Sequence, residues 1–204
     1  KSDEYSKAYK GKKAYTYGGE RYVMKEIQGI KDGFSDEVLD ELCRVMKATN
    51  IYLFCSQKQI LHYLDYFVTQ RGCNWNLLCW HKSDPIPACG NKYLSDTEYC
   101  LFFRESGVKL YGNFDTKRTY FVSTTNMDDK RKFGHPTCKP ENIIRNLVVN
   151  SSQEGDTVLD CFMGSGVTGA VCKLLNRNFI GCEIDKKHFD TAKERIENIQ
   201  LELW

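Results

Sequence analysis

A strand that ends in an acidic residue and a glycine-rich turn is the strongest constraint on how this chain folds. Residues 157–162 are mostly apolar, and Gly164 and Gly166 follow just before a helical pattern begins. Glycine lets a turn approach a ligand closely, because no Cβ intervenes. Glu183 follows Asp160 by about 20 positions, at the end of the next predicted strand. The sequence therefore predicts a strand–turn–helix unit with a ligand at the strand tip.

Short strands alternate with helices along most of the chain. Strands are predicted over 50–56, 74–80, 98–104, 118–123, 157–162 and 178–184. Helices are predicted from Ser35, around 60–68, from Pro140, and over 167–175 and 186–200. This alternation is typical of an α/β protein with helices on both faces of the sheet. We therefore predict a doubly wound, mostly parallel sheet.

Composition excludes several classes of protein. The 204 residues suit one domain, and 41% hydrophobic with 13% aromatic residues excludes general disorder. No run approaches the roughly 18 apolar residues of a membrane span, and the basic N-terminus has no apolar core of a signal peptide. The ten cysteines include no C-x-x-C pair, which favours reduced thiols in a cytoplasmic protein. His135 has no second ligand at metal spacing, so no metal is expected.

The residues around the turn limit which ligands it could bind. No Lys-Ser/Thr pair follows the glycines, which excludes a phosphate-binding P-loop. Gly164, Gly166 and Gly169 have dinucleotide-site spacing, but Asp160 would repel a pyrophosphate and attract an ammonium. Glu183 suits a ribose. S-adenosylmethionine carries both groups, while a turn without a ligand and a nicotinamide oxidoreductase remain alternatives.

Three motifs resemble those of DNA amino-methyltransferases. Residues 160–168 (Asp-Cys-Phe-Met-Gly-Ser-Gly-Val-Thr) are similar to the family's D-P-F-x-G-S-G-T-T. Residues 135–140 (His-Pro-Thr-Cys-Lys-Pro) are similar to H-P-T-x-K-P, and 80–87 to W-x-K-x-x-P-x-P, with Glu98-Tyr99 matching an E-Y that commonly follows. Their order is that of the permuted beta group, and the resemblance covers about residues 35–200.

Two positions depart from the family's glycine motif. Cys161 stands where proline is frequent, and Val167 where the first threonine is frequent, while Thr168 keeps its hydroxyl. The resemblance implies a Rossmann-like, S-adenosylmethionine-dependent methyltransferase fold that forms one domain over 1–204.

The resemblance also implies a cofactor site. Asp160 would face the methionine ammonium, Glu183 the ribose hydroxyls, and Lys139 the carboxylate. The residues expected to bind the cofactor are Asp160, Phe162, Gly164, Ser165, Gly166, Thr168, Glu183, Thr137, Lys139 and Pro140.

Double-stranded DNA is the implied partner, because an enzyme acting on a base in a duplex must extrude it and hold it in a pocket. The expected wall of that pocket is Trp80, His81, Lys82, Pro85 and Pro87. Residues 104–134 would be a target-recognition insertion and 1–34 a flap. The basic residues expected to contact DNA are Lys10, Lys12, Lys13, Lys117, Arg118, Lys130, Arg131 and Lys132.

The family's catalytic signature, [D/N/S]-P-P-[Y/F/W], is not among these 204 residues. In the permuted order it belongs before Lys1, on a strand between those over 157–162 and 50–56. We therefore expect the domain to be N-terminally incomplete, so no catalytic residue is assigned.

The expected function is site-specific methylation of the exocyclic amine of adenine in DNA, by the family's commoner usage. Methylation of cytosine N4 is the near alternative, and a non-catalytic S-adenosylmethionine- or DNA-binding module is another. The recognition sequence, the oligomeric state and a phage or restriction–modification setting stay open.

Overall fold

The computed structural model describes residues 33–87 and 89–199. The chain divides into two compact units after Gly33, and the fold below is that of the unit that begins at Phe34. The flap predicted over 1–34, with Lys10, Lys12 and Lys13, lies outside the described residues apart from Gly33 and Phe34.

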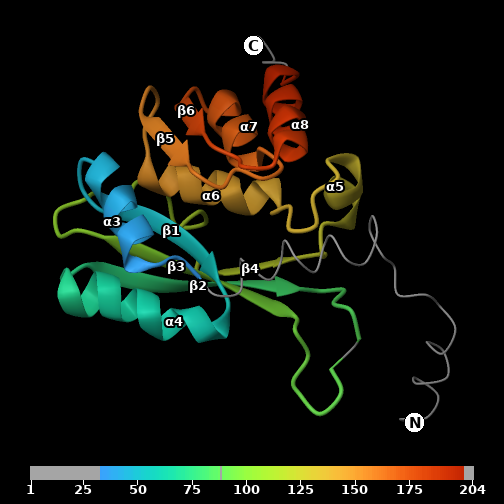
Figure 1. Ribbon diagram of the computed structural model, residues 1–204, viewed down its shortest axis with the longest axis horizontal. Helices are drawn as coiled ribbons and strands as arrows, with labels where there is room; N and C mark the ends of the chain where they lie inside the picture. Colours follow the sequence, from blue (N-terminus) through green and yellow to red (C-terminus); the bar gives the residue numbers. More distant parts are fainter. Residues whose placement is uncertain (1–32, 88, 200–204) are drawn as a thin grey trace, which may run out of the picture. The chain divides into compact units, whose positions relative to one another are not determined.

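Figure 1 shows the helices and strands of this unit. In chain order they are α3 (Asp36–Val45), β1 (Asn50–Cys55), α4 (Gln57–Leu64), the π-helix η1 (Asp65–Gln70), β2 (Asn74–Lys82), β3 (Thr97–Arg104), β4 (Tyr120–Ser123), α5 (Met127–Lys132), α6 (Glu141–Ser151), β5 (Thr157–Asp160), α7 (Val167–Leu174), β6 (Asn178–Gly181) and α8 (Lys186–Glu197). Each predicted strand is present, with ends that differ by a few residues.

The described strands form two sheets. β1, β3, β2 and β4 pair in that order, and β5 pairs with β6. Pairs β2–β4 and β5–β6 are parallel, whereas β3 runs antiparallel to both β1 and β2. β3 reverses because the loop after β2 contains no crossover helix, which a parallel return requires. Two of the four strand pairs are thus parallel and two antiparallel, so the pairing is mixed where a mostly parallel sheet was predicted, and the described strands do not join into one sheet.

Strands β1 and β5 each have one hydrogen-bonded neighbour among the described strands. Each therefore has one ladder edge without a partner in the described part of the chain. The sequence analysis expected the strand that carries the catalytic signature at this position.

One hydrophobic core lies between the four-stranded sheet and helices α6 and α7, which cover one of its faces (Figure 1). Leu78 and Phe102 contribute from the sheet, and Val171 from α7. Four apolar residues at spacings of three and four face inward from α6, as the helical pattern after Pro140 predicts, and all are buried, namely Ile143, Ile144, Leu147 and Val148. This core connects β5 and β6 to the larger sheet, because Val158 and Phe179 pack against it.

A second core lies on the opposite face, where α3, α4 and η1 cover β1 and β3. Phe67 stacks on Phe103 with ring centroids 4.4 Å apart. The apolar spacing of residues 60–68 predicts Leu61 on the inner face of α4, but this residue is 78% exposed. Tyr63 and Tyr66 occupy the inner face instead, because their rings bury more apolar area and their hydroxyls find hydrogen-bond partners in Phe34 and Asp40.

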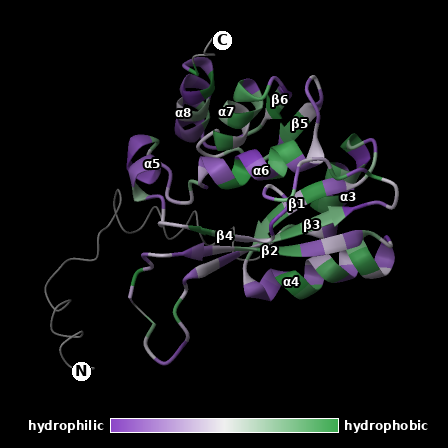
Figure 2. Cartoon of the chain, turned by 180° about the vertical axis from the view of Figure 1, so that it is seen from behind, coloured by the Kyte–Doolittle hydropathy of each residue, from purple (hydrophilic) through white to green (hydrophobic). Residues whose placement is uncertain are grey.

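The region between β4 and α6 is polar. Figure 2 shows α5 as strongly hydrophilic, and no residue of this helix is buried. Three basic side chains fill its last turn, where they face the negative end of the helix dipole. This helix belongs to the predicted recognition insertion over 104–134.

Gly166 is expected to be essential for folding, because a side chain there meets both strain and a clash. Its φ is 72°, and an added Cβ would lie 2.9 Å from the Cα of Ala192 in α8. We expect Gly166→Ala to lower the free energy of unfolding by about 2 kcal/mol or more. The measurement is urea unfolding followed by circular dichroism.

Gly72→Ala is the matched control, because Gly72 has a φ of 67° with open space around its Cβ position. It should cost only the backbone strain, about 1 kcal/mol. Equal losses in the two variants would contradict the predicted contact between the turn and α8.

Candidate functional site

The turn after β5 is organised around the carboxylate of Asp160. Its Oδ1 accepts a hydrogen bond from the Phe162 backbone N–H at 3.1 Å. Its Oδ2 accepts from the Thr168 hydroxyl, in the first turn of α7, at 2.7 Å. Two bonds from opposite sides of the turn therefore hold Asp160 at the strand tip, and Thr168 is explained as the residue that orients it.

The described residues offer the Asp160 carboxylate no cationic partner. Burial raises the pKa of this carboxyl, while the hydrogen bonds from Thr168 and Phe162 oppose the shift. Among residues 33–87 and 89–199, no lysine, arginine or histidine forms an ion pair with it. A carboxylate held in this way favours a cationic ligand, because a cation would recover the electrostatic cost of burial.

Glu183 lies on the other side of the turn, after β6. Its Oε2 accepts from the Gly164 N–H at 3.0 Å, and its Oε1 accepts from the Asp185 N–H at 3.0 Å. Each carboxylate oxygen has a further lone pair for a ligand hydroxyl. The side chain is thus fixed in place and still able to accept hydrogen bonds.

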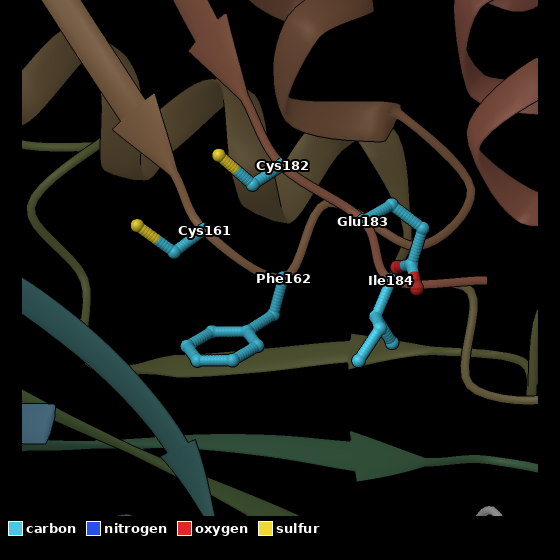
Figure 3. A pocket seen from close by; sticks show the side chains of 5 residues that line it. All are labelled: Cys161, Phe162, Cys182, Glu183 and Ile184. Atoms are coloured by element: carbon cyan, nitrogen blue, oxygen red, sulfur yellow. The ribbon is translucent and has the colours of Figure 1, made fainter. Parts of the chain in front are cut away.

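A cavity of about 310 Å³ lies where β5 and β6 end. Figure 3 shows the side chains that line it, which are Cys161, Phe162, Cys182, Glu183 and Ile184. The exposed Phe162 ring stacks on Phe34, with ring centroids 4.5 Å apart. This volume is at the lower end of the range for small-molecule sites, and the apolar wall with one fixed carboxylate is typical of them.

The loop over 135–140 packs directly on the glycine turn. The Ser165 hydroxyl donates to the Cys138 Sγ at 3.1 Å. A Cβ on Gly164 would lie 2.7 Å from His135 Nε2, so only glycine allows this approach. Thr137 lies beside the same ring, with its hydroxyl 3.4 Å from His135 Nδ1. The fold therefore brings together two motifs that the sequence analysis assigned to one cofactor site.

Arg195 of α8 is a buried residue that the sequence analysis missed. Its Nη1 donates to the Ser165 carbonyl at 3.4 Å, and its guanidinium lies 4.0 Å from the Phe133 ring centroid. Only 8% of the residue is exposed. The periodic apolar pattern of this helix gave no signal for it, because a charged residue is expected outside. Through the bond to Ser165, Arg195 holds the glycine turn against α8.

The five residues assigned to the base pocket have different surroundings. Trp80 is 2% exposed, and its indole N–H donates to the Ser123 hydroxyl at 2.8 Å, so this ring belongs to the interior. His81 is partly exposed and stacks on Tyr120. Pro85 is partly exposed and Pro87 exposed, in the loop after β2.

Lys82 and Lys139 both form ion pairs with Glu98, at 2.7 and 2.8 Å. Lys139 was expected at the cofactor, and Lys82 in the base pocket. The structure brings the two ammonium groups together on one carboxylate, a link that the sequence analysis did not include. Pro140, the last residue of the same motif, is buried next to Lys139.

The basic residues assigned to DNA differ in exposure. Lys117, Arg118, Arg131 and Lys132 are exposed, with Arg118 and Arg131 paired to neighbouring aspartates. Lys130 is partly buried, and burial lowers the pKa of its ammonium. In the described part of the chain no group of three or more His, Cys, Asp or Glu side chains is placed to hold a metal. None of the described helices has the length and apolar character of a membrane span.

His135 predicts a pH-dependent stability. Burial and the neighbouring His188 lower its pKa to about 4, with smaller opposing effects of Glu183 and Asp185 and a smaller lowering effect of Lys139. The unfolded chain, with a histidine pKa of about 6.5, binds a proton that the folded protein excludes. The stabilisation is therefore complete above about pH 6.5 and decreases as the pH falls towards about 4.

We expect wild type to lose about 1–2 kcal/mol more unfolding free energy than His135→Gln between about pH 7 and about pH 4.5. Urea unfolding at the two pH values measures the difference. His62→Gln, which changes a partly exposed histidine in α4, should keep the wild-type dependence. An unchanged pH dependence in His135→Gln would contradict the burial of this ring.

The known proteins that resemble this chain are DNA methyltransferases. The family model described as DNA methylase matches residues 6–194. The Type II methyltransferase M.HpaI of Haemophilus parainfluenzae is 33% identical over 186 residues, which cover 81% of this chain and 59% of that protein. M2.DpnII of Streptococcus pneumoniae is 35% identical over 135 residues, covering 60% of this chain and 50% of that protein. The chain thus spans about half the length of these curated relatives.

Solved structures agree with the fold. The crystal structure of the M1.HpyAVI–SAM complex superposes with a TM-score of 0.63 and 32% identity over 74% of each chain. PvuII DNA methyltransferase, described as cytosine-N4-specific, has the same fold at 13% identity, with a TM-score of 0.60 over 74% of this chain and 65% of that one. The predicted Rossmann-like α/β methyltransferase fold is confirmed. With its family model matched over nearly the whole sequence, this chain belongs to the DNA methylase family.

Proposed function

We propose that this chain binds S-adenosylmethionine at the turn between β5 and α7 and is part of an enzyme that methylates an exocyclic amine in double-stranded DNA. The observation that carries the proposal is the Asp160 carboxylate, which is held at the strand tip without a cationic partner among the described residues. Cys161, the next residue along the chain, lines the cavity at the ends of β5 and β6. Family membership supports the same ligand.

The residues around the turn suit the two ends of this cofactor. Asp160 would accept hydrogen bonds from the methionine ammonium, and Glu183 would accept from the ribose hydroxyls with its remaining lone pairs. Phe162 offers an exposed aromatic face beside the cavity. S-adenosylmethionine supplies an electrophilic methyl group on a sulfonium.

Thr168 is proposed to act through Asp160. Its hydroxyl donates to Asp160, so we assign it to orienting that carboxylate rather than to direct ligand contact. Gly164, Ser165 and Gly166 shape the turn, since their close contacts with His135, Cys138 and Ala192 set its path. The chain's own part in the reaction is to bind and orient the cofactor.

DNA is the proposed partner, with the exposed cations of 104–134 contacting phosphates. The candidates are Lys117, Arg118, Arg131 and Lys132. Such contacts fix the position of a protein on the duplex and carry no sequence information. We keep 104–134 as the target-recognition region, and His81 and Lys82 as candidates for the wall of the base pocket.

Adenine is the proposed target base, by the family's commoner usage. All ten cysteines lie in the described residues and are free thiols, which fits a reducing compartment, so we place the protein in the cytoplasm. A restriction–modification setting accords with the Type II relatives.

Asp160→Asn should weaken the binding of S-adenosylhomocysteine by about 10- to 100-fold, because one charge-assisted contact to the amino group is lost. Isothermal titration calorimetry measures the affinity. Asp156→Asn is the matched control, since Asp156 lies in the exposed loop before β5 and, among the described residues, its side chain accepts a hydrogen bond only from the nearby Gln153 N–H. If Asp160→Asn binds as tightly as wild type, this assignment of Asp160 is wrong.

Expression of the intact gene in a host without DNA methylation should produce N6-methyladenine at one sequence context. Digestion of host DNA and mass spectrometry of the nucleosides identify the methylated base. N4-methylcytosine would replace the proposed base by its alternative, and no methylated base from a folded, cofactor-binding protein would favour the non-catalytic module.

A further inference from the structure

Glu98 joins two lysines that come from distant parts of the sequence. It lies near the start of β3, directly opposite Trp80 of β2. Its Oε1 pairs with Lys82 at the end of β2, and its Oε2 with Lys139 in the loop before α6. One carboxylate therefore fixes the end of β2 relative to the loop that packs on the glycine turn.

The aromatic neighbours restrict both ammonium groups further. Lys82 Nζ lies 5.1 Å from the Trp80 ring centroid, and Lys139 Nζ lies 5.0 Å from that of Phe54. The side chains of Lys82 and Lys139 are only 16% and 20% exposed. Each lysine is thus held between a ring and a carboxylate, which is unusual for side chains with so much conformational freedom.

The charges of this cluster do not cancel. Burial alone would raise the pKa of Glu98, but Lys139 and Lys82 lower it to about 2, so the carboxylate stays charged. Burial lowers the pKa of Lys130 in α5, and the charges of Lys82 and Lys139 lower it further while that of Glu98 raises it. Glu98 thus pairs with two ammonium groups and interacts electrostatically with a third, and without it the three would repel one another in a site of limited solvent access.

The cluster is connected to the candidate cofactor site through one residue. Cys138, the neighbour of Lys139, accepts the hydrogen bond from Ser165 in the glycine turn. A change in the position of Lys139 would therefore reach the turn through adjacent backbone.

We propose that Glu98 is a positioning residue that sets Lys139 for the cofactor and Lys82 for DNA. The proposal rests on the proposed function and on the place at the cofactor's carboxylate that the family resemblance implies for Lys139. Each ammonium has three donors, so one bond to Glu98 leaves others for a ligand. By acting on both lysines, Glu98 ties the geometry of the cofactor side to that of the DNA side.

A double-mutant cycle on S-adenosylhomocysteine affinity tests this proposal in the full chain. By calorimetry, Glu98→Gln and Lys139→Met should each weaken binding about 10-fold, and the double variant should also bind about 10-fold more weakly than wild type, not about 100-fold. Lys82→Met should leave this affinity unchanged and weaken binding to a DNA duplex in fluorescence anisotropy. Glu98→Gln should weaken both.

Glu105→Gln is the matched control, because Glu105 follows the far end of β3, where it accepts a hydrogen bond from Thr49 N–H and pairs with no lysine or arginine of the described residues. It should bind both ligands like wild type. Glu98→Asp keeps the charge on a shorter side chain that reaches one lysine less well. Its affinities for S-adenosylhomocysteine and for DNA should fall between those of wild type and Glu98→Gln. It also serves if Glu98→Gln fails to fold, as judged by urea unfolding.

Independent, multiplied losses in the cycle, or wild-type affinities in a folded Glu98→Gln or Glu98→Asp, would overturn the role of Glu98 while leaving the cofactor site intact. No binding by wild type would instead overturn the proposed cofactor site, and this inference with it.

Discussion

The site depends on one partly buried carboxylate, that of Asp160 at the tip of β5. The Asp160 carboxylate is costly to withdraw from water, and the Thr168 hydroxyl and Phe162 N–H compensate only part of that cost. One donor lies in the glycine turn and the other in the first turn of α7, so the turn closes around the carboxylate. The hydrogen bonds that shape the turn therefore also hold the carboxylate that favours a cationic ligand.

Close packing around the glycines holds this arrangement together. His135 occupies the space where a Gly164 side chain would be, and Ala192 does the same at Gly166. Arg195 supports the turn from α8, where its guanidinium bonds the Ser165 carbonyl and covers an aromatic ring. Three segments that are far apart in sequence thus meet at one turn. Glu98 links the same region to the end of β2, because it pairs with both Lys139 and Lys82.

Local sequence patterns predict the helices and strands of this fold well. They predict the tertiary contacts between these elements less well. The apolar residues of α6 and the strand before the glycine turn follow from periodicity and composition alone. The burial of Tyr63 in place of Leu61 does not, because the preference for aromatic rings with bonded hydroxyls emerges only against a specific sheet face. Buried charges such as Arg195, and the pairing of Lys139 with Glu98 across 41 positions, depend on tertiary contacts that no local pattern contains.

The most direct test of the account is a crystal structure of the intact protein with bound S-adenosylhomocysteine. The account predicts the amino group of the ligand on Asp160, its ribose hydroxyls on Glu183 and its remainder against Phe162 in the cavity at the ends of β5 and β6. A ligand bound elsewhere, with Asp160 still bonded only to Thr168 and Phe162, would contradict the account.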